Sequence, residues 1–250
     1  MRVGKIRGIV IGERQQGESS KQLTVLAKGA GKLYLSARGA KNTKSRLLAG
    51  AQLFAYCDFT LFAKNGFASV NQIDLLDSFY GLRNDVAVLS QAVYLAELAD
   101  RICPLGMEQD DILLLLLHTL KHMEKGGLPP KLAGRIFEIK SLFFSGLFSD
   151  VECAVCGDAG DAGDAGDAAY FDMAQGCFLC QKHKTQGAEP LLPAVQKALT
   201  YVLEEGGKDI FAFRLSEEAL AQLDKVLRRY IQIHIGVDLQ SRRFAADICF

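Results

Sequence analysis

The hydrophobic period of this chain changes once, near residue 80, and this change limits the possible folds more than any other feature. Before it, apolar and β-branched residues come in five short runs, which predict β-strands. The runs are residues 5–11, 22–27, 32–37, 51–63 and 67–75. After it, longer runs repeat every three to four residues, which predicts helices. The sequence therefore indicates an α+β protein, with a β domain at residues 1–80 and a helical domain at residues 81–250.

Turn residues separate the predicted strands. Gly29-Ala30-Gly31 lies between the second and third strands. Lys64-Asn65-Gly66 lies between the last two, and Asn-Gly is typical of a hairpin because both central residues of a type I′ turn need positive φ. Five short strands in about 75 residues fit a small β-barrel, for which the OB-fold is the leading candidate. Residues 38–46 show no apolar period and are expected to form a loop.

Five helices are predicted after residue 80 from their period and their end signals. They are residues 85–102, residues 110–125, a segment opened by Pro129-Pro130, residues 190–204, and a segment capped by Ser216. The third helix is expected to bury one face, made of Leu132, Ile136, Ile139, Phe143 and Leu147. The last is expected to bury Leu220, Leu223, Leu227, Tyr230 and Ile231.

Positive charge is concentrated at the N-terminus. The first 50 residues hold eleven lysines and arginines against two acids, a net charge of +9, and the other 200 residues carry −9 because the whole chain is neutral. Such asymmetry predicts a segment that binds a polyanion. The tightest cluster of candidate phosphate contacts is Arg38, Lys41, Lys44 and Arg46. The other candidates are Lys5, Arg7, Lys21 and Lys32.

Aromatic residues of the predicted barrel are candidates for stacking on nucleic-acid bases, as in OB-folds that bind single strands. The candidates are Tyr34, Phe54, Tyr56, Phe59 and Phe67. For most of them, a place in the barrel core is the stronger interpretation, because large aromatic side chains are usually buried.

A cysteine cluster with the spacing CxxC-x20-CxxC predicts a zinc module at about residues 150–187. It consists of Cys153, Cys156, Cys177 and Cys180, and His183 follows. Zinc prefers four nitrogen or sulfur ligands in a tetrahedron, and the spacing alone leaves open whether Cys177 or His183 is the fourth. A closed site of four ligands leaves no position for a water molecule. The pattern therefore predicts a structural Zn²⁺ ion and not a catalytic one.

Four tandem Gly-Asp-Ala units occupy residues 157–168, inside the predicted module. Glycine and aspartate cannot bury apolar area, so these units predict a flexible acidic spacer. No apolar run approaches the roughly 18–20 residues that cross a bilayer. The N-terminus also lacks a signal-peptide cleavage pattern. The sequence thus predicts a cytoplasmic protein with no membrane contact.

Residues 8–56 resemble the N-terminal domain of the RecO family. The likeness consists of Gly8-Ile9-Val10, Gly17-Glu18-Ser19-Ser20, Gly31-Lys32, Gly39-Ala40-Lys41, Ser45-Arg46 and Gln52-Leu53-Phe54. It continues through the helical part and the cysteine cluster to Arg229-Tyr230-Ile231, His234 and Ser241. The resemblance favours His183 as the fourth metal ligand, because Cys177 stands where the family usually has a glycine.

The resemblance implies a recombination mediator of DNA repair in the RecF pathway and not an enzyme. RecO proteins bind single- and double-stranded DNA, anneal complementary strands, and with RecR load RecA onto DNA coated with single-strand-binding protein. A nucleoid-associated, cytoplasmic location is therefore expected. The competing hypothesis is a zinc-containing protein-interaction adaptor whose basic N-terminal segment docks an acidic partner.

Overall fold

Five strands close into a barrel at the N-terminal end of the computed structural model, as the sequence predicts. They are β1 (Arg2–Gln16), β2 (Ser20–Ala27), β3 (Gly31–Ala37), β4 (Tyr56–Lys64) and β5 (Phe67–Asp77). Their order around the barrel is β1-β2-β3-β5-β4, and every neighbouring pair is antiparallel except β3 and β5. This order and the chain length are those of an OB-like barrel.

The structure describes residues 2–64, 67–148, 151–157, 169–204, 209–236 and 239–248. The predicted Asn65-Gly66 turn and residues 158–168 of the predicted acidic spacer lie outside these ranges. The prediction of a strand at residues 51–63 is wrong at its start, because β4 begins at Tyr56. Phe54 has a left-handed φ of 71° and its N–H donates to the carbonyl of Val10. The chain therefore turns against β1 before it enters β4.

Six helices follow the barrel in the described part of the chain. They are α1 (Val86–Ile102), α2 (Asp110–Glu124), α3 (Pro130–Phe144), α4 (Pro193–Glu204), α5 (Glu217–His234) and α6 (Gln240–Ile248), with short 3₁₀ helices η1 (Tyr80–Asn84) and η2 (Asp209–Phe211). Asp85 caps α1 and Ser216 caps α5. A small sheet of order β7-β6-β8 is made of β6 (Tyr170–Asp172), β7 (Cys177–Leu179) and β8 (Ala188–Pro190). Neither this sheet nor α6 is predicted from the sequence.

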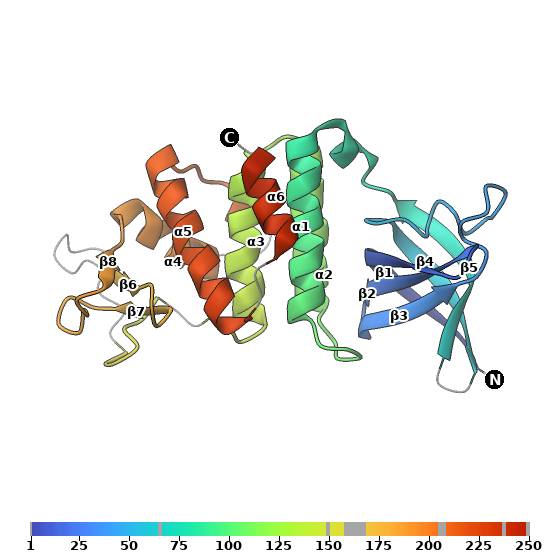
Figure 1. Cartoon of the computed structure of the whole chain (residues 1–250), viewed down its shortest axis with the longest axis horizontal. Helices are drawn as coiled ribbons and strands as arrows, with labels where there is room; N and C mark the ends of the chain where they lie inside the picture. The colour runs from blue at the N-terminus through green and yellow to red at the C-terminus, as the bar shows by residue number, and fades with distance from the viewer. Residues whose placement is uncertain are drawn as a thin grey trace.

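The elements form an elongated molecule, with the barrel at one end and the small sheet at the other (Figure 1). Helices α1 and α2 lie next to the barrel, α3 and α6 come next, and α4 and α5 lie beside the small sheet. Alternation along β1 links the barrel to the helices. Val10 points into the barrel, whereas Ile9 and Ile11 belong to the core that runs through the helices. The barrel and the helical part therefore pack against each other through a continuous apolar core.

The turn between β2 and β3 is fastened to the connection between α1 and α2. The N–H of Gly106 donates to the carbonyl of Lys32 at 2.9 Å, and the N–H of Gly29 donates to Asp110 Oδ1 at 2.7 Å. Gly31 has a φ of 66°, and a Cβ atom built on it would lie 1.6 Å from the carbonyl oxygen of Met107. Only glycine fits this approach, which fixes the barrel against the helices.

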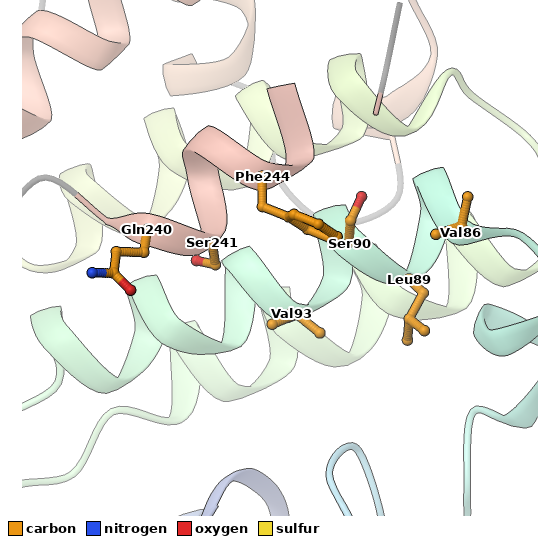
Figure 2. A pocket seen from close by; sticks show the side chains of 7 residues that line it. All are labelled: Val86, Leu89, Ser90, Val93, Gln240, Ser241 and Phe244. Atoms are coloured by element: carbon orange, nitrogen blue, oxygen red, sulfur yellow. The ribbon is translucent and has the colours of Figure 1, made fainter. Parts of the chain in front are cut away.

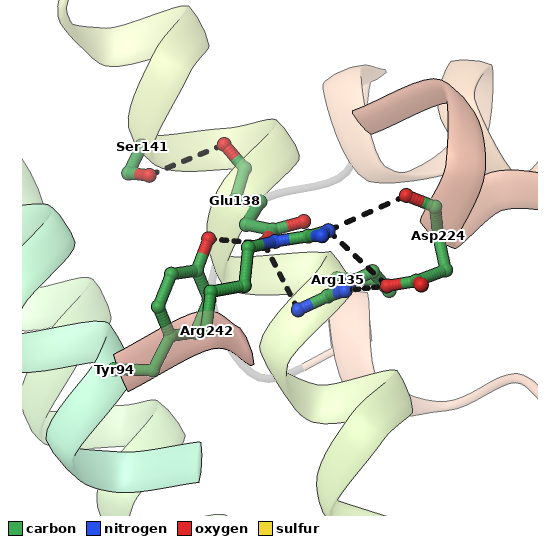
Figure 3. Close-up of polar contacts among 6 residues, drawn as sticks. All are labelled: Tyr94, Arg135, Glu138, Ser141, Asp224 and Arg242. Atoms are coloured by element: carbon green, nitrogen blue, oxygen red, sulfur yellow. Dashed lines mark hydrogen bonds and ion pairs between the residues drawn. The ribbon is translucent and has the colours of Figure 1, made fainter. Parts of the chain in front are cut away.

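Helix α3 is buried on more than its apolar face. Phe143 and Leu147, expected in the core, are each 36% exposed, whereas Arg135 and Glu138 are almost fully buried. Glu138 Oε1 pairs with Arg135 Nη2 at 2.9 Å and with Arg242 Nε of α6 at 3.1 Å, and it accepts a hydrogen bond from the Tyr94 hydroxyl (Figure 3). This ionic cluster joins α1, α3 and α6.

Asp224 of α5 completes the cluster by pairing with both arginines (Figure 3). Burial opposes ionisation of Asp224, but Arg135 and Arg242 hold its pKa below the ordinary value. Burial, together with the charge of Glu138, raises the pKa of Tyr94 well above the ordinary value, so the phenol stays protonated and donates. Two cations and two anions thus offset each other where desolvation makes any one of them costly.

The ionic cluster should stabilise the helical part measurably. Glu138→Gln keeps the side-chain volume but leaves two buried arginines with one carboxylate, and we expect it to lower the free energy of unfolding by about 3–5 kcal/mol. Lys225→Ala is the control, because it breaks the exposed pair with Glu189 (58% and 44% exposed) and should cost at most about 1 kcal/mol. Urea denaturation measures both; equal effects of the two variants would contradict the assignment.

Candidate metal centre and nucleic-acid surface

Four side chains of the cysteine cluster converge at the end of the molecule opposite the barrel. One ligand atom from each of Cys153, Cys156, Cys180 and His183 lies within 4.8 Å of the other three. Cys156 Sγ is 3.9 Å from Cys180 Sγ, and His183 Nδ1 is 3.6 Å from Cys153 Sγ and 3.3 Å from Cys180 Sγ. A tetrahedron with Zn–S near 2.3 Å and Zn–N near 2.05 Å has edges of about 3.8 and 3.6 Å. These four residues could therefore hold a metal ion.

Backbone turns prepare the thiols for this role. The N–H of Gly157 donates to the carbonyl of Cys153 at 2.8 Å, and that of His183 donates to the carbonyl of Cys180 at 3.1 Å. Burial opposes ionisation of Cys153, but backbone N–H groups of Cys180, Cys156 and Val155 lower its pKa to about 6. A thiolate is the form that ligates metals.

The remaining described cysteines lie in different surroundings. Cys177 Sγ lies 3.8 Å from Gln175 Oε1, and Cys177 is not one of the four residues of the cluster. Cys57 and Cys103 are core residues, and burial raises the pKa of each thiol to about 12. Neutral buried thiols are poor metal ligands.

Aromatic packing holds the candidate metal site on the helices. The Phe178 ring of β7 lies 5.6 Å from Phe148 and 5.1 Å from Phe171. The Tyr230 ring of α5 lies 4.8 Å from Phe148. The N–H of Ala154, between the first two cysteines, donates to the carbonyl of Phe178 at 2.9 Å. The small sheet thus joins the ligand loops to the core of the helical part.

The basic cluster of residues 38–46 follows β3 as a series of turns. Its four cationic side chains, Arg38, Lys41, Lys44 and Arg46, are exposed and make no ion pair with any described residue. We call these four residues the basic loop. The N–H of Lys41 donates to the carbonyl of Ser19 at 3.0 Å, which ties this loop to the turn between β1 and β2. Its charges therefore remain available to a ligand from solvent.

The other four predicted phosphate contacts differ from the basic loop. Lys5 is exposed. Arg7 forms a two-point pair with Asp58 (2.7 and 2.8 Å), and this hydrogen-bonded pair lowers the pKa of the Asp58 carboxyl. Lys21 Nζ lies 2.7 Å from Glu13 Oε2 and 3.0 Å from the carbonyl of Ala51. Arg7 and Lys21 would have to give up these partners to bind a phosphate.

Lys32 does not reach the outer surface. Its side chain is 11% exposed, and its Nζ lies 3.2 Å from Asp100 Oδ1 at the end of α1. The expected phosphate contact at Lys32 is corrected to a contact between the barrel and the helices, and we leave Lys32 out of the candidate surface. Sequence patterns cannot predict this pair, because the two residues are 68 positions apart.

Of the aromatic candidates, Phe59 lies in the barrel core and Phe54 lies where the barrel meets the helices, both with about 1% exposure or less. Tyr56 is partly buried, and Tyr34 is 48% exposed. The side chain of Phe67 lies outside the described residues. The interpretation as barrel core thus holds for Phe59, whereas Phe54 is buried at the contact with the helices; of the four described side chains, Tyr34 reaches furthest into solvent.

The strand register places several polar residues on one outward face of β1, β2 and β3. Arg14 lies opposite Gln22, which lies opposite Ser36; Gln16 lies opposite Ser20, whose hydroxyl accepts from the N–H of Gly39. We call this set, with Tyr34, the open face. It contains no carboxylate, since Glu13 points toward Lys21. Arg14 is not among the predicted contacts; the β-bulge between Val10 and Gly12 shifts the alternation of β1, so that Arg14 pairs with Gln22 on this face.

One further cleft, of about 330 Å³, lies between α1 and α6 (Figure 2). Val86, Leu89, Val93 and Phe244 make it largely apolar, and Ser90, Gln240 and Ser241 add uncharged polar groups. It contains no titratable side chain. No helix in the described ranges is both long and apolar enough to cross a membrane.

Both parts of the chain match descriptions of one protein family. Residues 1–79 match "Recombination protein O N terminal" and residues 83–243 match "Recombination protein O C terminal". A DNA repair protein RecO of Acetivibrio thermocellus is 33% identical over 231 residues, which are 91% of this chain and 90% of that protein. That of Alkaliphilus metalliredigens is 32% identical over 250 residues, 98% of this chain and 99% of that protein. The chain therefore belongs to the RecO family of DNA repair proteins.

Proposed function

We propose that this protein is a recombination mediator that binds single- and double-stranded DNA through its barrel. It anneals complementary strands and, with RecR, loads RecA onto DNA coated with single-strand-binding protein. The observation that supports this proposal best is the basic loop, four exposed cations beside an open face that contains no carboxylate. Such a surface attracts the phosphate backbone without reading the base sequence.

Annealing follows from this kind of surface. Cations that contact phosphates offset the repulsion between two strands, and contacts without sequence preference let the strands search for their complement. The protein then acts as a mediator and not as an enzyme, because no bond is made or broken. It would act on the nucleoid, in the cytoplasm.

We further propose that Cys153, Cys156, Cys180 and His183 bind a structural Zn²⁺ ion. When bound, zinc would link the two ligand loops and contribute folding free energy to the small sheet. Four protein ligands close the coordination sphere, so the ion would have no open position for a substrate. DNA binding by the barrel at the other end of the molecule would not require the metal directly.

Metal analysis separates the possible ligand sets. His183→Ala should reduce the zinc content from about one ion per chain to near zero, because zinc binds weakly with three ligands. It should also lower the melting temperature of the helical part. Cys177→Ser is the matched control and should keep the ion. Loss of zinc in Cys177→Ser with retention in His183→Ala would reverse the proposed ligand set.

Salt-dependent DNA binding tests the basic loop. Replacing Arg38, Lys41, Lys44 and Arg46 by alanine removes four phosphate contacts. The slope of log affinity against log salt concentration should fall by about three to four units, and affinity at about 0.1 M salt should fall on the order of 100-fold. Fluorescence anisotropy of a labelled oligonucleotide across a salt series measures both, and strand annealing should weaken in parallel.

A variant with the same loss of charge controls for net charge. Lys125, Lys182, Lys197 and Arg228 are exposed and lie outside the barrel. Their replacement by alanine should leave the salt slope within one unit of the wild type. If the two quadruple variants behave alike, the basic loop is not the DNA contact. If neither single- nor double-stranded DNA binds the wild type, the adaptor with an acidic protein partner becomes the better hypothesis.

A further inference from the structure

The outward face of β1, β2 and β3 is divided into rows that run across the strands. The first row, Ile9, Leu26 and Lys32, is buried against the helices. The second is Gly12, Thr24 and Tyr34, and the third is Arg14, Gln22 and Ser36. The second row is therefore the margin at which the helical cover ends and the open face begins.

Tyr34 dominates this margin. It is 48% exposed, its neighbour Thr24 is 8% exposed, and Gly12 has no side chain. The Tyr34 ring makes no contact with another aromatic ring or with a cation among the described residues. A large ring with an exposed face and small neighbours can accept another flat ring.

The connection between α1 and α2 brings one more apolar side chain near the margin. Leu105 forms a bridge with Lys32, and Tyr34 follows two residues later on the same face, about 7 Å further along β3. Leu105 is 57% exposed, whereas Met107 lies against Gly31, on the other side of Lys32 from Tyr34. An exposed leucine near an exposed tyrosine forms an apolar edge to an otherwise polar face.

Cations lie at the other end of the same face. Arg38 directly follows the end of β3, four residues after Tyr34, and Arg14 lies in the row next to Tyr34 on the side toward Arg38. A strand of nucleic acid that follows this face would therefore meet an aromatic ring at one end and free cations at the other. Stacking on aromatic side chains beside a basic groove is the usual way in which proteins hold single strands.

We propose that Tyr34, with Leu105 at its edge, forms a platform on which one unpaired base of a single strand stacks. This inference deepens the proposed function, on which it rests, by assigning unpaired bases to this margin. A base inside a duplex has both faces covered by its neighbours and cannot use the platform. The platform thus favours single-stranded over double-stranded DNA, whereas the basic loop binds the phosphates of both.

The test uses the full-length protein with oligothymidine, the same oligomer with abasic residues, and a duplex. Tyr34→Ala should weaken oligothymidine binding about tenfold and leave duplex binding within about twofold, because phosphate contacts persist. Tyr34→Phe should bind as the wild type does, since it keeps the ring. Tyr80→Ala removes a tyrosine that is 69% exposed on η1, away from this face, and should have no effect.

The abasic oligomer identifies stacking. Wild type should bind it about tenfold more weakly than oligothymidine, and Tyr34→Ala should bind the two oligomers equally. Leu105→Ser should produce a smaller loss in the same direction. Wild-type affinity of Tyr34→Ala for oligothymidine, or an equal loss on the duplex, would overturn the platform. The proposed function is retained after that result if the basic-loop variant still binds both the oligothymidine and the duplex more weakly than the wild type does. It is contradicted if that variant binds both with wild-type affinity.

Discussion

The docking of α1 and α2 against one end of the β1–β2–β3 face decides which barrel residues reach solvent. Ile9, Ile11 and Leu26 are buried there, Gly31 permits the close contact with Met107, and Lys32 pairs with Asp100. What remains of the face is Tyr34 and a polar surface that ends at Arg38. Every second residue of β2 and β3 faces outward, and the β-bulge between Val10 and Gly12 aligns Gly12 and Arg14 of β1 with them, so the register fixes the rows beyond the covered one.

The same core continues through the helices to the candidate metal site. Glu138, Arg135, Arg242 and Asp224 hold α3, α5 and α6 together, and the rings of Phe148, Phe178 and Tyr230 attach the small sheet. The barrel and the cysteine cluster are therefore at fixed opposite ends of one packed molecule (Figure 1). Under the proposed function, the candidate zinc site would keep a structural role at one end while the barrel would bind DNA at the other.

The sequence predicted the five strands, five of the six helices in the described ranges and the candidate metal ligands, because each depends on local period or spacing. It could not separate the basic loop from Arg7 and Lys32, since their partners Asp58 and Asp100 are 51 and 68 residues away. Nor could it predict that Arg135 and Glu138 are buried, because polar residues on a helix normally face solvent. That Arg14 and Tyr34 lie on one outward face follows only from the register that aligns three strands.

Hydrogen–deuterium exchange of the free protein and of its complex with a single-stranded oligonucleotide tests most directly where DNA lies. Binding on the open face and the basic loop should slow exchange in residues 12–24 and 34–46, where backbone amides would be covered or stabilised. Exchange in residues 170–190, around the candidate metal site, should not change. Protection confined to α4, α5 and the small sheet, with none in the barrel, would contradict the account.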